Sequence, residues 1–133
     1  MSKPVRIYLM AIKPKYAEMI YAGDKRFELR KMPPPCNTWI YLYESAPVSA
    51  VTGKVYIGMQ IKGDSAIVWN FVKTQRYCRN ELGVTEKQYK DYVGKSYHCS
   101  ASMLFFAERF DKPWPLPQGV RPPQNWGRYY VGE

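Results

Sequence analysis

LMAIKPKYAEMIYAGDKRFELRK, from Leu9 to Lys31, is the stretch from which most of the fold can be predicted. Alternating apolar residues from Val5 to Ala11 predict a strand with one face in the core. Pro14 then suits the first turn of a helix, and Gly23 suits the position just after its end. A second strand begins near Lys25, so the predicted order is strand, helix, tight turn, strand.

The second strand carries more charge than a structural strand requires. Glu28 and Arg30 are two residues apart and share a face, whereas Phe27 and Leu29 form the apolar face. Lys25 is an odd number of residues from Glu28, so we expect Lys25 to reach Glu28 from the turn. A Lys and a Glu in a cleft can perform acid/base or nucleophilic chemistry, while an Arg can hold a phosphate or carbonyl oxygen. The alternative is a solvated strand face on which Glu28 pairs with an arginine.

The middle of the chain predicts further strands and a helical insertion. Strands are expected over residues 39–43 and 49–61, from their β-branched and aromatic residues. Asp64 is the expected N-cap of a helix, and Trp69 falls outside the apolar stripe of that helix. A second helix is expected to begin at Thr85, with Gln88 at capping-box spacing and Tyr89, Tyr92 and Val93 on its buried side.

The last third of the chain predicts one long strand followed by a tail. Apolar and polar residues alternate over residues 97–110, as in a β-strand, and five prolines follow in the remaining sequence. We expect an extended tail that four aromatic side chains hold against the sheet: Trp114, Trp126, Tyr129 and Tyr130.

Composition and charge limit the class of protein. The 133 residues suit one domain, residues 1–133, and the 46% hydrophobic content excludes a disordered chain. Lys and Arg outnumber Asp and Glu by 20 to 11, giving a net charge of +9, and residues 1–31 hold eight basic and three acidic residues. This excess favours an anionic partner, with nucleic acid the first candidate. The alternative is that the charge serves solubility.

Other signals point away from several classes. Cys36, Cys78 and Cys99 are far apart, so we expect free, mostly buried thiols and neither a disulfide framework nor a zinc site. No cofactor or metal is predicted. His98 is the single histidine, which argues against a Ser-His or Cys-His nucleophile pair. No apolar run is long enough to span a bilayer and no signal-peptide pattern is present, so we expect a cytoplasmic protein without membrane contact.

The motif around the second strand resembles that of the ASCH domain family. Its GxKxxExR pattern is matched by Gly23, Lys25, Glu28 and Arg30. Later blocks also resemble this family, particularly its forms in phages and their bacterial hosts: residues 41–45 (YLYES), 51–53 (VTG) and 113–130, with PPQ at 122–124. The resemblance covers nearly the whole chain. It implies an α+β, PUA-like small β-barrel of about five or six strands, with a helix after strand one and a helical insertion before the last long strand.

The resemblance also implies a range of activities. A PUA-like fold implies a cleft beside the first helix that binds RNA or a modified nucleoside. Small family members are amidohydrolases that act on N4-acetylcytidine with a Lys, a Thr three residues later and a distal Glu. Lys25 matches that Lys, but Glu28 occupies the Thr position, which removes the hydroxyl nucleophile. Other relatives are metal-dependent ribonucleases, and a phosphodiester substrate suits Lys25, Glu28 and Arg30 electrostatically.

Three functions therefore remain open. The first is binding of RNA or a modified nucleotide in a basic cleft. The second is hydrolysis of an N4-acetylcytidine-type nucleoside or of RNA, with Lys25 and Glu28 as the catalytic pair. The third is a phage-type interaction module whose basic face occupies the nucleic-acid site of a host protein. The candidate binding residues are the cleft residues and three aromatics expected to stack on bases: Lys13, Lys25, Glu28, Arg30, Tyr43, Trp69 and Tyr8.

Overall fold

Six strands and three helices form the described part of the chain. The computed structural model describes residues 5–74 and 84–131. The elements are, in order, β1 Val5–Ile12, α1 Pro14–Tyr21, β2 Phe27–Arg30, β3 Thr38–Glu44, β4 Ala50–Asp64, α2 Ser65–Thr74, α3 Glu86–Val93, β5 His98–Trp114 and β6 Trp126–Val131. The predicted α+β class, the helix after strand one and the helical insertion before the long strand are confirmed.

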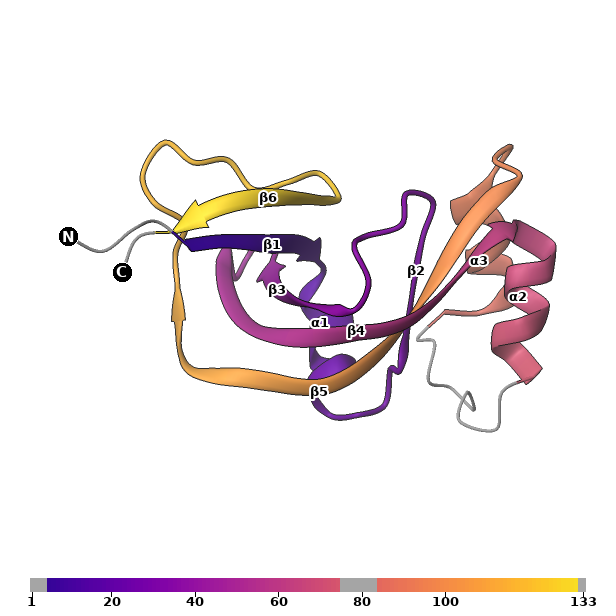
Figure 1. The fold of residues 1–133 in the computed structure, drawn as a ribbon, viewed down its shortest axis with the longest axis horizontal. Coiled ribbons are helices and arrows are strands. Elements are labelled where there is room, and N and C mark those ends of the chain that lie inside the picture. The colour runs from indigo at the N-terminus through magenta and orange to yellow at the C-terminus, as the bar shows by residue number, and fades with distance from the viewer. Residues whose placement is uncertain (1–4, 75–83, 132–133) are drawn as a thin grey trace.

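The strands form one mixed sheet in the order β2-β5-β4-β3-β1-β6. The β1–β3 pair is parallel, and the other pairs are antiparallel. The long strands β4 and β5 run through the length of the molecule, with α2 and α3 at one end and the β1–β6 pair at the other (Figure 1). None of the helices in the described ranges is long and apolar enough to cross a membrane.

Helix α1 begins and ends as its sequence predicts. Pro14 occupies the first turn, where its missing N–H is not needed. At the other end Gly23 has φ +82°, and its N–H donates to the Ile20 carbonyl at 3.1 Å. The Asp24 N–H donates to the Met19 carbonyl at 2.9 Å, which completes a Schellman motif. This tight ending brings Lys25 directly to the start of β2.

Among the described residues, the core consists of three apolar clusters. One lies between α1 and the sheet, one lies beneath α2 and α3, and one lies on the other side of β1 and β3. Strand β1 contributes Met10 and Ile12 to the first cluster and Ile7 and Leu9 to the third. The expectation of one core face for this strand is therefore wrong, because α1 covers one face and aromatic side chains from β5 and β6 cover the other.

The end of the chain is more regular than the sequence suggests. Strand β5 continues to Trp114, and Trp126–Val131 forms β6, which pairs with β1 from Met10↔Trp126 onward. Local sequence does not reveal this pairing, because β1 lies more than a hundred residues earlier. Three of the four predicted aromatics are partly buried against the core, but Tyr130 is 69% exposed, so its predicted packing role is wrong.

The caps of the second and third helices are confirmed. Asp64 Oδ1 accepts from the backbone N–H of Ala66 at 2.9 Å, and Thr85 and Gln88 form the predicted capping box. Tyr92 is 43% exposed, however, and does not join Tyr89 and Val93 in the core.

The free thiols fall in different environments. Cys99 is buried and Cys36 is exposed, and both are free. Cys78 lies outside the described residues. The expectation of mostly buried thiols therefore holds for Cys99 and fails for Cys36.

Candidate functional site

Lys25, Glu28 and Arg30 form one buried ion-pair cluster. Lys25 Nζ lies 3.2 Å from Glu28 Oε1, and Arg30 Nη2 lies 2.7 Å from Glu28 Oε2. Arg30 Nε also donates to Glu28 Oε2, at 3.0 Å, so the Arg–Glu contact uses two donors. Lys25 is 3% exposed and Glu28 is 6% exposed. As expected, Lys25 reaches Glu28 from the turn. Of the alternative, the pairing of Glu28 with an arginine is present, but the burial of Glu28 excludes a solvated strand face.

Arg30 also joins the two edges of the sheet. Strands β2 and β6 stand at opposite ends of the strand order. Arg30 lies at the end of β2, and its Nη1 donates to Asn125 Oδ1 at 2.7 Å, just before β6. Its Nη2 donates to the Ala11 carbonyl on β1, also at 2.7 Å. The Arg30 side chain thus connects β2 at one edge of the sheet to the β1–β6 pair at the other edge. The ion-pair cluster lies where these two edges come together.

The charge state of Glu28 follows from its neighbours. Burial alone would raise the pKa of this carboxyl, but the positive charges of Lys25 and Arg30 and their hydrogen bonds outweigh burial and lower it. Glu28 is therefore a carboxylate at neutral pH. A carboxylate with a lowered pKa is a weak general base and cannot serve as a general acid, so the geometry suits Glu28 to holding Lys25 and Arg30 in position.

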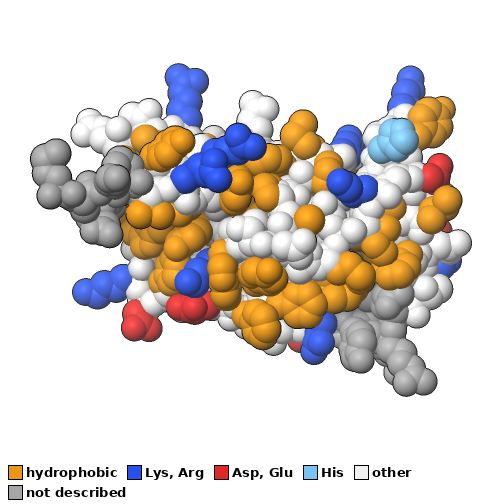
Figure 2. Space-filling model, in the orientation of Figure 1, with side chains coloured by type: hydrophobic (Ala, Val, Ile, Leu, Met, Phe, Trp, Pro, Cys, Tyr) orange, Lys and Arg blue, Asp and Glu red, His pale blue; other side chains and the backbone are white. Residues whose placement is uncertain are grey.

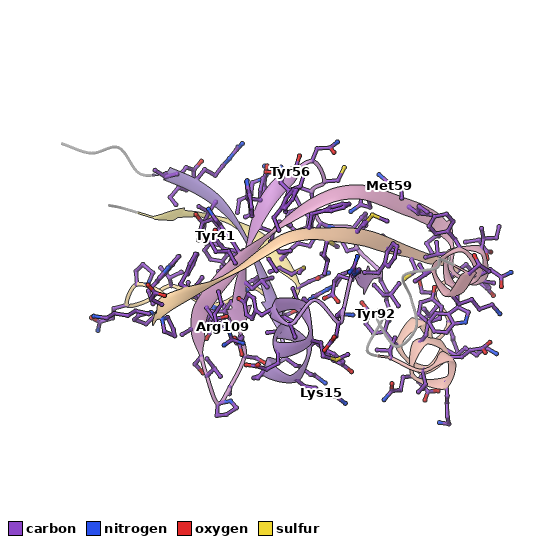
Figure 3. All side chains as sticks on the ribbon, turned by 90° about the horizontal axis from the view of Figure 1, so that it is seen from below. Lys15, Tyr41, Tyr56, Met59, Tyr92 and Arg109 are labelled. Carbon is purple, nitrogen blue, oxygen red and sulfur yellow. The ribbon has the colours of Figure 1, made fainter. Side chains whose placement is uncertain are left out.

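The cluster lies at a cavity of about 570 Å³. Helix α1 supplies one wall with Tyr16, and α3 supplies the facing wall with Gln88, Tyr89 and Tyr92. Figure 3 shows Lys15 of α1 and Tyr92 of α3 on the same side of the long strands. The full lining is Ala11, Ile12, Lys13, Tyr16, Lys25, Glu28, Leu29, Arg30, Ser45, Val84, Gln88, Tyr89, Tyr92, Pro123 and Gln124. A volume of this size suits a ligand of nucleotide dimensions.

Two tyrosines of the cavity contact lysine side chains, one inside the cavity lining and one beside it. Lys25 Nζ lies 5.5 Å from the centre of the Tyr16 ring, and Lys31 Nζ lies 5.1 Å from the centre of the Tyr92 ring. The Tyr92 hydroxyl also accepts from the Lys31 N–H at 3.1 Å, which ties α3 to the end of β2. These contacts hold flat aromatic surfaces beside the basic residues.

Four of the seven predicted site residues line this cavity, namely Lys13, Lys25, Glu28 and Arg30. The three predicted aromatics do not. Tyr43 is buried in the cluster on the other side of the sheet, and Tyr8 packs edge-on against Trp126, with the ring centres 6.3 Å apart.

Trp69 is buried as well, which corrects the expectation that it falls outside the buried stripe of α2. Trp69 is 9% exposed and its ring centre lies 4.7 Å from that of Tyr89, on which it stacks, whereas Ile67 of the same helix is 68% exposed. The reason is that α3 packs beside α2 and covers Trp69.

The tyrosines of the cavity walls were not among the predicted site residues. Tyr89 and Tyr92 come from α3, more than fifty residues after the motif, and no local pattern links them to it. The Tyr89 hydroxyl donates to the Ser65 carbonyl at 2.6 Å, and burial raises its pKa, so Tyr89 stays a neutral phenol. Tyr16 lies in the helix before the motif, and its i, i+4 spacing from Ile20, which places both on the core-facing side of α1, was the available signal.

The described residues offer no obvious metal site. Across residues 5–74 and 84–131, no three His, Cys, Asp or Glu side chains come close enough together to hold an ion. Glu28 is the acidic residue of the cavity lining, and both of its oxygens are engaged by Lys25 and Arg30.

Comparison with solved structures places this fold in the α+β, PUA-like class. The crystal structure of ASCH from Zymomonas mobilis superimposes with a TM-score of 0.76 at 25% identity, covering 95% of this chain and 87% of that one. The structure of a tyrosine-to-phenylalanine mutant of that protein gives a TM-score of 0.77 at 25% identity, covering 95% and 90%. No family model matches the sequence.

Sequence comparison agrees with the structural match. The chain is 31% identical over 98 residues to an ASCH domain-containing ribonuclease from Zymomonas mobilis, over 72% of this chain. The chain belongs to the ASCH domain family. The match spans 62% of the length of that relative.

Proposed function

We propose that this protein binds single-stranded RNA, or a modified nucleotide, in the cavity between α1 and α3. The observation that carries the proposal is the buried Lys25–Glu28–Arg30 cluster at a cavity of about 570 Å³. Burying Lys25 and Glu28 beside a partly buried Arg30 is costly, and replacing such clusters by apolar residues often stabilises a protein. A cluster that is retained at the wall of a cavity is better explained by a ligand than by stability.

The chemistry of the walls supports a nucleotide. Lys13 is exposed beside the cavity, and with Lys25 it supplies positive charge for a phosphate. Tyr16 and Tyr92 offer rings on which a base can stack, and unstacked bases of single-stranded RNA are read in this way. Gln88 and Gln124 carry amides, which can both donate to and accept from a base edge.

The first test is RNA binding as a function of salt. A labelled single-stranded RNA should bind with a steep salt dependence, and Lys13→Ala should lower the salt slope by about one, as expected for one phosphate contact. Lys25→Met should weaken binding at every salt concentration. The matched control is Lys112→Ala, since Lys112 is exposed and does not line the cavity. Absent or salt-independent binding by the wild type contradicts the proposal.

A second candidate function is cleavage of RNA, which the ribonuclease name of the Zymomonas relative favours. In this reading Lys25 stabilises negative charge on the phosphodiester, and Glu28 acts by positioning Lys25. Incubation of the purified protein with end-labelled RNA should give cleavage that Lys25→Ala removes, with and without a chelator. If RNA stays intact while binding is measurable, binding alone is the function.

A further inference from the structure

A second cavity, of about 490 Å³, shares Lys25 with the first. It lies between the end of α1 and β5, where Gly23 and Arg26 face Phe105 and Phe106. Lys25 lines both cavities, so it stands between them. A ligand longer than one nucleotide, bound beside Lys25, can therefore continue into the second cavity around the turn that follows α1.

The second cavity opens onto a chain of aromatic rings on three neighbouring strands. Phe105 and Phe106 of β5 are 6.0 Å apart between ring centres, and Phe106 lies 6.4 Å from Tyr56 of β4. Tyr56 in turn lies 5.6 Å from Trp39 of β3. We call these four rings the aromatic track. Tyr56 and Met59 project from β4 on the side opposite Lys15 and Tyr92, so the track follows a different face from the first cavity (Figure 3).

Three rings of the aromatic track are exposed to solvent. Phe106 is 75% exposed, and Phe105 and Trp39 are each 38% exposed. Phe106 has φ +55°, a left-handed conformation that bulky residues rarely adopt and that costs free energy. Gly58 lies directly beneath Phe105, since a Cβ there would come within 2.7 Å of the Phe105 ring. The left-handed backbone of Phe106 thus accompanies an exposed ring, and the missing Cβ at Gly58 leaves room for the Phe105 ring to lie against β4.

Cations accompany these rings. Lys54 Nζ lies 4.7 Å from the centre of the Trp39 ring, and Arg26 is exposed at the second cavity. Figure 2 shows the face from which Tyr56 and Met59 project, with hydrophobic side chains spread across it and Lys and Arg side chains among them. Aromatic rings interleaved with basic side chains are the features by which proteins hold single-stranded nucleic acid without reading its sequence.

We propose that single-stranded RNA leaves the first cavity past Lys25, passes through the second cavity and stacks its next bases on the aromatic track. The proposal rests on the RNA binding proposed above and adds the direction and extent of the bound strand. Phe106 is the first stacking ring along this route, and Trp39 with Lys54 is the last.

The test compares RNA of 2 and of 10 nucleotides, both of mixed sequence. Phe106→Ala and Trp39→Ala should each weaken binding of the 10-nucleotide RNA roughly fivefold or more, the loss expected for one stacked base, and leave the 2-nucleotide RNA unchanged. Tyr97→Ala is the matched control, because Tyr97 is 78% exposed and lines neither cavity. Lys13→Ala should weaken both RNAs.

Three other results of these experiments would overturn the proposed path of the RNA. If Lys13→Ala weakens both RNAs while Phe106→Ala and Trp39→Ala change neither, the track is overturned and the cavity proposal stands. If the wild type binds neither RNA, the proposed function fails and the track fails with it. If the wild type sediments as a dimer and Phe106→Ala as a monomer, the track is an interface between two copies of this chain, which also overturns the proposal.

Discussion

At the scale of single residues, Glu28 gains a role different from the one its sequence position suggested. The family motif paired it with Lys25 as a catalytic partner, but its two carboxylate oxygens are divided between Lys25 and Arg30. Because its pKa is lowered, the carboxylate keeps both cations in place throughout the neutral range. Glu28 is thus placed as the counter-ion of two cations.

Replacing Glu28 by Gln should destabilise the protein by about 3 kcal/mol or more, since it leaves two buried cations without their counter-charge. Chemical denaturation at pH 7 measures this change. Glu28→Asp is the matched variant, because it keeps the negative charge on a shorter side chain. It should lower the free energy of unfolding by less than Glu28→Gln does. Equal stability of wild type and Glu28→Gln would contradict the buried network.

The lowered pKa of Glu28 also fixes the direction of a pH effect. Between the folded-state pKa and the ordinary value of 4.5, the unfolded chain binds the proton and the folded chain does not. The stabilisation is therefore fully present above pH 4.5 and is lost as pH falls through the folded-state pKa. Wild type should lose more stability on acidification than Glu28→Gln, measured by denaturation at pH 6 and pH 3.

At the scale of elements, much of the chain was predictable where local signals decide the structure. The bounds of α1 followed from Pro14 and Gly23, and the start of α3 followed from Thr85 and Gln88. The sequence could not show β6 or the walls of the cavity, because β6 pairs with β1 and Tyr92 meets Lys31 only after the sheet has formed. Pairings between distant segments leave no local periodicity.

The crossing of β4 and β5 gives a prediction at this scale. A Cβ at Gly53 would overlap the backbone carbonyl oxygen of Glu108 and come within 2.5 Å of the Tyr21 hydroxyl oxygen. Gly53→Ala should therefore cost about 1–3 kcal/mol through overpacking against backbone that cannot move aside. Gly58→Ala is the matched control, since it meets the half-exposed Phe105 ring, which can swing outward. Thermal denaturation that ranks Gly58→Ala as the more harmful would contradict this packing.

At the scale of the whole molecule, one side chain links fold and function. Arg30 connects the edges of the sheet through Asn125 and Ala11 while it holds Glu28, and Glu28 holds Lys25 at the cavity. The candidate site is thus formed where the sheet edges meet, with α1 and α3 as its walls. Lys25, Glu28 and Arg30 could be predicted from the sequence as site residues. The tyrosines of α1 and α3 that line the same cavity became apparent only from the folded structure.

The measurement that tests the central claim most directly is a crystal structure with a short single-stranded RNA bound. We predict density for a phosphate within about 4 Å of Lys25 Nζ or Lys13 Nζ, the distance of an ion pair, and a base against the Tyr16 or Tyr92 ring. Density for RNA elsewhere on the surface, with the cavity between α1 and α3 filled by solvent alone, would contradict the account.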